Sequence, residues 1–223
     1  MGAEAKTNSW SDVLTTPLGS ISCSALSSLP FEVGPDGLSR TSGTIHIRQE
    51  SFDLPVDWNR GLDPLPEEID GGRCWRWYFK CGSEDPPEID IRCGLNVPSD
   101  AIWDTANREN LVAMSYKLLD EEVHIGTEDH KLLYTRTLSP AGLFPARFKD
   151  LLALPTAFAQ GLITLGHSGV VIRVPRLQRG ERLYFHMIAA YKHIMRRGDI
   201  STWNAVDRAK CHIDEWQLGR GPE

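Results

Sequence analysis

The chain has 223 residues and a formal net charge of −6, with 30 acidic and 24 basic side chains. This length favours one large domain, or one domain with a small appendage. The acidic balance argues against a broad electrostatic surface for nucleic acid or anionic lipid. No stretch approaches the ~18 apolar residues of a membrane span. Five cysteines without a signal-like N-terminus indicate reduced thiols and a cytoplasmic protein.

The first part of the chain differs in composition from the rest. Residues 1–42 are rich in Ser, Thr, Gly and Pro, with turn signals at 17–19 and 33–37. They predict an irregular N-terminal arm. Residues 43–223 are expected to form a single α+β domain.

Several stretches alternate apolar and polar residues with a period of two, which is typical of half-buried strands. These stretches are 44–52, 74–81, 89–93 and 169–174. Residues 74–81 and 89–93 are expected to form a hairpin or a neighbouring pair. Residues 131–138 and 199–206 also have β character.

Other stretches carry apolar residues at helical spacing. Residues 100–119 predict a helix, with Trp103, Leu111, Met114 and Leu118 on one stripe. Helices are expected on both sides of Pro155, at 140–152 and 158–165, and a short one at 208–218. Residues 120–130 are charged and predict a loop. The predicted fold is therefore α+β, an antiparallel sheet with several short helices packed on one face.

Residues 182–194 fit two patterns. Leu183, Met187 and Tyr191 match a helical stripe, whereas every second residue from Leu183 is apolar, as in a strand. The strand is favoured because a hairpin with residues 169–174 would bury Val170 and Ile172 directly.

Motifs for catalysis or metal binding are incomplete. Residues 161–168 have the glycine spacing of a phosphate-binding loop, but His167 stands where lysine is needed. Residues 166–169 lack the second glycine of a nucleophile elbow, and a turn is the simpler interpretation. The clustered thiols have the wrong spacing for zinc, as do His124 and His130 within their acidic stretch; these thiols are Cys74, Cys81 and Cys93. No catalytic residue, metal or cofactor is therefore predicted, and His186 and His193 are taken as ordinary residues.

The most aromatic stretch suggests a binding surface. Trp75 and Trp77 fall on one face of their strand, and Arg76 and Tyr78 on the other. Trp, Tyr and Arg are the residues that most often anchor protein interfaces. These four residues are predicted to bind a protein partner or a second copy of the chain, with the acidic residues 57–70 attracting a basic partner.

Two classes of function remain open, and the lack of a catalytic motif favours the first. It is a non-enzymatic interaction or assembly protein of the adaptor, toxin-neutralising or self-assembling type. The second is a hydrolase-like enzyme whose site is assembled from residues distant in sequence. Pro155, Phe158, Gly166 and Gly169 also resemble a late segment of rhabdovirus matrix proteins. That resemblance implies a viral matrix-type structural protein, although the acidic balance argues against it.

Overall fold

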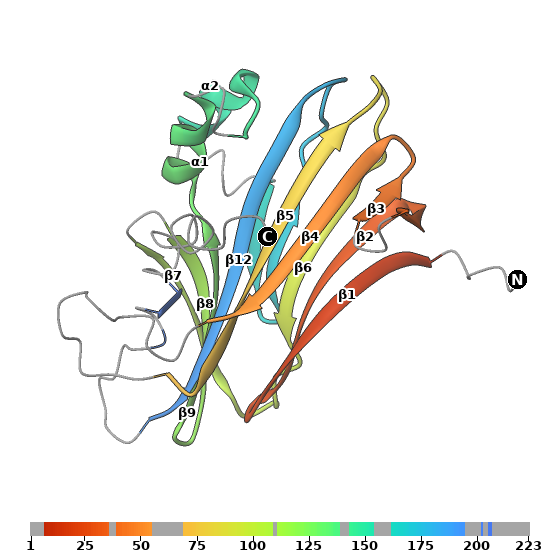
Figure 1. Cartoon of the computed structure of the whole chain (residues 1–223). Helices are drawn as coiled ribbons and strands as arrows, with labels where there is room; N and C mark the ends of the chain where they lie inside the picture. Colours follow the sequence, from red (N-terminus) through yellow and green to blue (C-terminus); the bar gives the residue numbers. More distant parts are fainter. Residues whose placement is uncertain are drawn as a thin grey trace, which may run out of the picture.

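The chain folds mainly as antiparallel sheet that curls into a nearly closed barrel (Figure 1). The computed structural model describes residues 7–35, 39–54, 69–108, 111–138, 143–153, 162–194, 202 and 205–206. The predicted α+β class is wrong, because segments expected to be helical form strands of the barrel and the described helices do not cover a face of the sheet.

The sheet has twelve described strands. Their bounds are β1 Thr7–Thr16, β2 Gly19–Val33, β3 Ser39–Ser42, β4 Ile45–Asp53, β5 Gly71–Cys81, β6 Ile89–Leu95, β7 Ile102–Arg108, β8 Leu111–Leu118, β9 Glu121–Glu128, β10 Ile163–Gly166, β11 Gly169–Arg173 and β12 Arg182–His193. Neighbours follow the order β10-β11-β6-β2-β3-β4-β5-β12-β9-β8-β7, and β1 pairs with β2. Strand β12 thus joins β5 to β9.

The barrel interior is filled by large apolar side chains. Trp75, Trp77 and Phe79 of β5 point inward and are at most 2% exposed. Phe79 stacks on Phe185 of β12 with ring centroids 5.6 Å apart, and Trp77 meets Trp10 of β1 edge-on at 5.4 Å. Burying aromatic side chains of this size supplies much of the free energy of folding.

The outer face of the same strands carries a second apolar cluster. Cys74, Leu111 and Ile188 are fully buried there, together with Ala205 and Val206 from the C-terminal part of the chain. The sheet is therefore covered on both faces at this point.

Strand β1 is held to the barrel by polar contacts as well as by pairing. Asp12 accepts a hydrogen bond from the indole Nε1 of Trp75 at 2.8 Å. Arg73 lies 3.4 Å from Asp12 and donates to the carbonyl oxygen of Val13 at 3.0 Å. The sequence prediction of irregular structure in residues 1–42 is wrong for β1, β2 and β3.

The described helices lie at one end of the barrel (Figure 1). They are α1, His130–Thr137, and α2, Lys149–Leu152, preceded by a 3-10 turn at Ala146–Phe148. Helix α1 begins after Asp129, whose carboxylate accepts from the backbone amides of Lys131 and Leu132. This N-cap overrides the β character of residues 131–138.

Strands replace the helix and the loop predicted between residues 100 and 130. Val112, Met114 and Tyr116 face the interior, and the residues between them face outward, so β8 has a period of two. The residues that suggested a helical stripe lie on both faces of β8, with Met114 inside the barrel and Leu111 on the outer face. In β9, Val123 and Ile125 point inward, and pairing with β8 and β12 buries the polar residues of the outer face, Glu122, His124 and Glu128.

Residues 182–194 form a strand, as favoured, but its partners differ from the expected hairpin. Strand β12 pairs with β5 and β9, whereas β11 pairs with β10 and β6. Strands β5 and β6 are likewise not neighbours. Residue 202 and residues 205–206 are helical, against the β prediction for 199–206. Residues 163–165, the end of the helix predicted at 158–165, belong to strand β10, so that part of the prediction is wrong. Residues 158–161, residues 208–218 and residues 55–68, with most of the acidic stretch, lie outside the described residues.

One membrane-related expectation can be examined in the structure. Among the described residues, no helix has the length and the apolar content needed to cross a bilayer.

Strand β11 allows a direct test of the barrel core. Val170, Ile172 and Val174 share the interior cluster with Trp75, as the sequence predicts. We expect Ile172→Ala to lower the free energy of unfolding by about 2–5 kcal/mol, because it leaves a cavity in a packed core. Val171→Ala, half-buried on the outer face, should cost about 1 kcal/mol or less. Equal losses in urea denaturation would contradict this assignment of faces.

Candidate functional site

A row of charged side chains crosses the outer face of four strands. Glu50 of β4 is paired in register with Arg76 of β5, and Arg76 with His186 of β12. Glu128 of β9 completes this polar row. Thr127 is paired with Met187 in the antiparallel ladder, so the adjoining residues Glu128 and His186 lie opposite each other. Arg76, His186 and Glu128 are 3%, 1% and 0% exposed. Charged groups are rarely buried to this degree without a specific role.

Glu128 orients the imidazole of His186. Its Oε1 lies 2.9 Å from His186 Nδ1, an ion-pair distance without the alignment of a hydrogen bond, and also accepts from Arg136 of α1. Burial raises the pKa of Glu128, but His186 and Arg136 outweigh it and hold that pKa below its ordinary value. The ionised carboxylate favours a ring proton at Nδ1, which leaves Nε2 as the nitrogen that could exchange a proton with a bound molecule.

Several buried polar atoms in this region lack a hydrogen-bond partner in the described part of the chain. They are His186 Nε2, Tyr184 Oη, Glu128 Oε2 and Arg76 Nε. Each such atom costs about 1–3 kcal/mol if it stays unsatisfied. Most buried polar groups in proteins are paired, so this concentration makes the polar row the candidate functional site.

Two tyrosines, Tyr78 and Tyr184, lie beside the polar row and contact its arginines. Arg76 donates from Nη2 to Tyr78 Oη at 2.5 Å, and its Nη1 lies 3.5 Å from Glu50. Arg136 stacks over the ring of Tyr184 at 4.5 Å. Burial raises the pKa of Tyr184, so its hydroxyl stays protonated and can donate. The arrangement combines a base, a phenol donor and two cations.

The structure separates the four residues predicted to bind a partner. Trp75 and Trp77 are buried inside the barrel, at 0% and 1% exposure, whereas Arg76 and Tyr78 lie on the outer face. Tyr78 is half-buried. The partner-binding role of these residues stays a prediction.

Sequence reasoning missed His186, Glu128 and Arg136. His186 was set aside because its spacing to His193 fits no shared site, and Glu128 was placed in a loop. A signal for both is present, because His186 lies within, and Glu128 follows, a period-two apolar pattern that marks its strand. No sequence pattern shows that the two strands are adjacent.

The glycine-rich stretch at 166–169 forms the turn between β10 and β11. Gly169 has a φ of +134°, and a Cβ atom there would lie 2.2 Å from the carbonyl oxygen of Cys93. Only glycine fits this backbone and this close approach. The ring of His167 contacts Trp103 edge-on, with ring centroids 5.7 Å apart. Strands β10 and β11 are not paired with any strand of the polar row.

Two thiols, Cys23 and Cys93, lie opposite each other on β2 and β6, but the described residues do not form a larger group of metal-binding side chains. The described cysteines, Cys23, Cys74, Cys81 and Cys93, are buried and free. Burial raises the pKa of Cys74, so its thiol is a weak nucleophile. Within the ranges that the structure describes, no three His, Cys, Asp or Glu side chains are placed to hold one metal ion.

A second polar network lies on the other side of the outer apolar cluster. Thr202 donates from Oγ1 to Glu122 at 2.6 Å and therefore accepts from His124 Nδ1 at 2.8 Å. Lys117 Nζ lies 2.5 Å from Glu122. This chain of contacts connects the C-terminal helical residues to β9, and we assign it a structural role.

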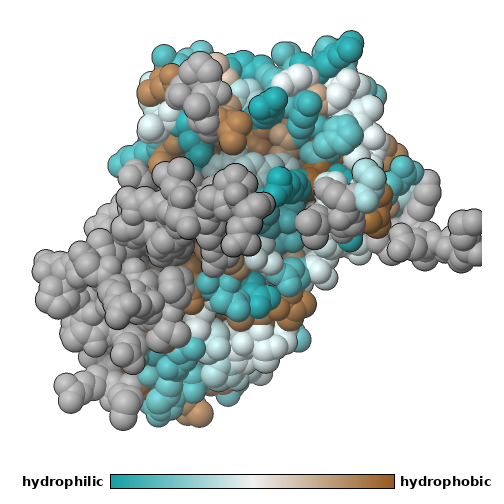
Figure 2. Space-filling model, viewed as in Figure 1, coloured by the Kyte–Doolittle hydropathy of each residue, from teal (hydrophilic) through white to brown (hydrophobic). Residues whose placement is uncertain are grey.

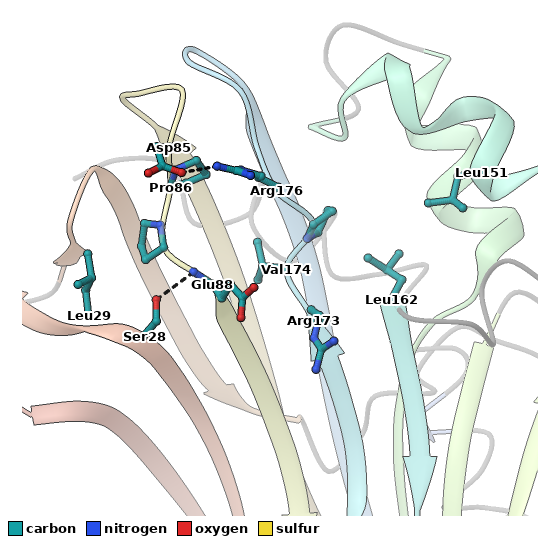
Figure 3. A pocket seen from close by; sticks show the side chains of 12 residues that line it. Ser28, Leu29, Asp85, Pro86, Glu88, Leu151, Leu162, Arg173, Val174 and Arg176 are labelled. Carbon is teal, nitrogen blue, oxygen red and sulfur yellow. Dashed lines mark hydrogen bonds and ion pairs between the residues drawn. The ribbon is translucent and has the colours of Figure 1, made fainter.

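A wide groove of about 750 Å³ lies near the ends of β2, β6 and β11 (Figure 3). Its floor includes Val174, and Leu162 stands on one side. Its exposed cations are matched by acids, since Arg176 pairs with Asp85 and Arg173 with Asp90. It lacks the buried unpaired atoms of the polar row.

The second network predicts acid sensitivity. Burial lowers the pKa of His124 to about 4, a shift that Lys117 supports and Glu122 opposes. The unfolded chain takes up this proton near pH 6.5, so stability should fall from about pH 6.5 to about pH 4, by up to about 3 kcal/mol. His124→Gln should flatten that dependence in urea denaturation at pH 7, 5.5 and 4.5.

His193 provides the matched control, since it is exposed and Glu121 raises its pKa. A raised histidine pKa adds stability at low pH that is lost as pH rises, so His193→Gln should act in the opposite sense. Parallel pH profiles for His124→Gln and the unsubstituted protein would show that His124 is not the group responsible.

The functional assignment rests on this geometry. A scan of the sequence against models of known protein families finds no match, and a search of curated proteins also finds no match.

Proposed function

We propose that the protein is an acid–base enzyme that binds a small anionic molecule at the polar row. This is the enzyme alternative of the sequence analysis, with a site assembled from residues distant in sequence. The observation that supports it most is the set of buried, unpaired atoms around His186. Such atoms are costly in a purely structural network and useful in a site that must contact a substrate.

His186 is the general base in this proposal. Its Nε2 removes a proton from a bound water or from the substrate, and Glu128 stabilises the imidazolium that forms, at 2.9 Å from Nδ1. Negative charge that develops on the substrate lies near Arg76 and the hydroxyl of Tyr184. A positioned base of this kind typically contributes ~10²–10⁴-fold to a rate.

A generic probe of a buried base tests the proposal. With 5-nitrobenzisoxazole, proton removal from carbon and cleavage of the N–O bond release a coloured phenolate. We expect a rate above that of buffer that falls at least about tenfold in His186→Gln. His193→Gln and His124→Gln are the controls and should keep the rate. A rate that survives His186→Gln would mean that another group is the base.

Tyrosine substitutions separate function from stability. The hydroxyls of Tyr184 and Tyr116 are both buried and unpaired in the described part of the chain, one on the outer face and one inside the barrel. Removing an unpaired buried hydroxyl should leave the melting temperature unchanged or raise it. Tyr184→Phe should slow the probe reaction, whereas Tyr116→Phe should not. A large destabilisation by Tyr184→Phe alone would indicate a structural role.

A protein-interaction role is a second candidate, and strand β7 favours it. Ile102 and Trp103 are 74% and 43% exposed, and β7 pairs only with β8 among the described strands. Edge strands with exposed apolar residues tend to pair with other chains. If the protein self-associates through β7, Ile102→Lys with Trp103→Ser should reduce its mass by light scattering at about 100 μM.

Leu119 offers the matched control for this test. It is 93% exposed in the turn after β8, so Leu119→Ser removes a similar apolar side chain away from the strand edge. A monomeric unsubstituted protein, or an equal effect of Leu119→Ser, would exclude self-association through β7.

A further inference from the structure

A small groove lies on the outer face of β4, β5 and β12, one strand position beyond the polar row. Its volume is about 310 Å³, and its walls are formed by His46, Arg48, Lys80, Arg182, Tyr78 and Leu143 among others. Figure 2 shows hydrophilic and hydrophobic side chains interspersed over the upper part of the molecule. Tyr78 belongs to both regions, since it lines the groove and accepts a hydrogen bond from Arg76.

The charges of this groove are all of one sign. Among the described residues that line it there is no acid, although the whole chain carries a net charge of −6. The register makes the arrangement less favourable still, because Lys80 is directly paired with Arg182, a second cation. Like charges placed opposite each other across strands destabilise a sheet.

Little in the described part of the chain neutralises these charges. Arg48 pairs with Glu50 at 2.7 Å, but Glu50 is shared with Arg76. Glu181, next to Arg182 in sequence, is engaged by Arg147. The side chains of His46, Lys80 and Arg182 form no ion pair or hydrogen bond within the described ranges. A cluster of cations without acids is the electrostatic signature of an anion site.

We infer that this groove binds the phosphate monoester group of a small molecule. A phosphate dianion can satisfy several cations at once, and Arg and Lys are the side chains that bind it best. The volume is at the lower end of the range for ligand pockets, enough for a phosphate and the adjoining part of a ligand. Tyr78 and Leu143 also line the groove, and their apolar surfaces suit a ligand that carries an organic portion beside its phosphate.

The groove lies next to the polar row, so a ligand bound in it could reach the proposed base. A ligand held by its phosphate in the groove would extend past Tyr78 toward Tyr184 and His186, whose rings lie 6.3 Å apart between centroids. This last step rests on the proposed function, whereas the recognition of phosphate does not. The two can therefore fail independently.

Phenyl phosphate and inorganic pyrophosphate are suitable probes in isothermal titration. We expect saturable binding that weakens as salt rises, and at least a tenfold loss of affinity in the double variant Lys80→Gln, Arg182→Gln. The control is Arg173→Gln, which removes an exposed arginine of the mixed-charge groove of Figure 3 and should bind like the unsubstituted protein. Without ligand, Lys80→Gln should raise the melting temperature, because it relieves repulsion.

A lipid headgroup could present the same phosphate chemistry as a free metabolite. Sedimentation with phosphatidylcholine vesicles containing phosphatidate distinguishes the two sources. Vesicle binding that the double variant abolishes, without competition by phenyl phosphate, indicates a lipid. Binding of phenyl phosphate alone indicates a soluble ester. The inference is overturned if neither probe binds below ~10 mM, or if the double variant binds both as well as the unsubstituted protein.

Variants of the polar row distinguish failure of the phosphate site from failure of the acid–base function. Tyr184→Phe and His186→Gln should leave the affinity for inorganic pyrophosphate unchanged, because they lie outside the groove. If pyrophosphate binds as expected but no His186-dependent rate is found, the phosphate site stands and the acid–base function does not. If the rate depends on His186 but neither phosphate probe binds, the reverse holds.

Discussion

Strand β5 sets the organisation of the protein, because its pairing fixes which side chains point inward. Its register with β4 and β12 extends along most of the strand, from Arg73 to Lys80 on both sides. Trp75 and Trp77 are thereby directed into the barrel, and Arg76 and Tyr78 out of it. A shift of one residue would exchange the two faces and place an arginine in the core. The cost of that exchange makes the position of the polar row as firmly determined as that of the core.

The sequence predicts the strands whose alternation is strong. Residues 74–81 and 169–174 are strands because large apolar side chains occupy every second position, and the strand alternative for 182–194 is right for the same reason. The failures have two physical causes. Burial of charged residues in β9 depends on partners far away in the chain, and the start of α1 depends on the capping carboxylate of Asp129.

The candidate site could not be predicted because its residues are far apart in the sequence. Glu50, Arg76, Glu128 and His186 come from separate strands, and only the register of three strand pairs aligns them. The cationic groove has the same origin, since His46, Lys80 and Arg182 are unremarkable surface residues until they are placed side by side. Arg76 and Tyr78, which flank Trp77, are the residues of these sites that the sequence pointed to.

The place of β12 in the sheet has a consequence for how the protein is made. Every strand from β1 to β6 lies on one side of β12 and β7 to β9 on the other, so nothing but this late segment pairs β5 with β9. While the chain emerges from the ribosome, the tryptophan-rich β5 has an open edge until residues near 193 have been synthesised. Contacts of such long sequence separation form slowly. The edge of β5 therefore stays open while about half of the chain is synthesised, and unpaired strand edges of this kind are prone to aggregation.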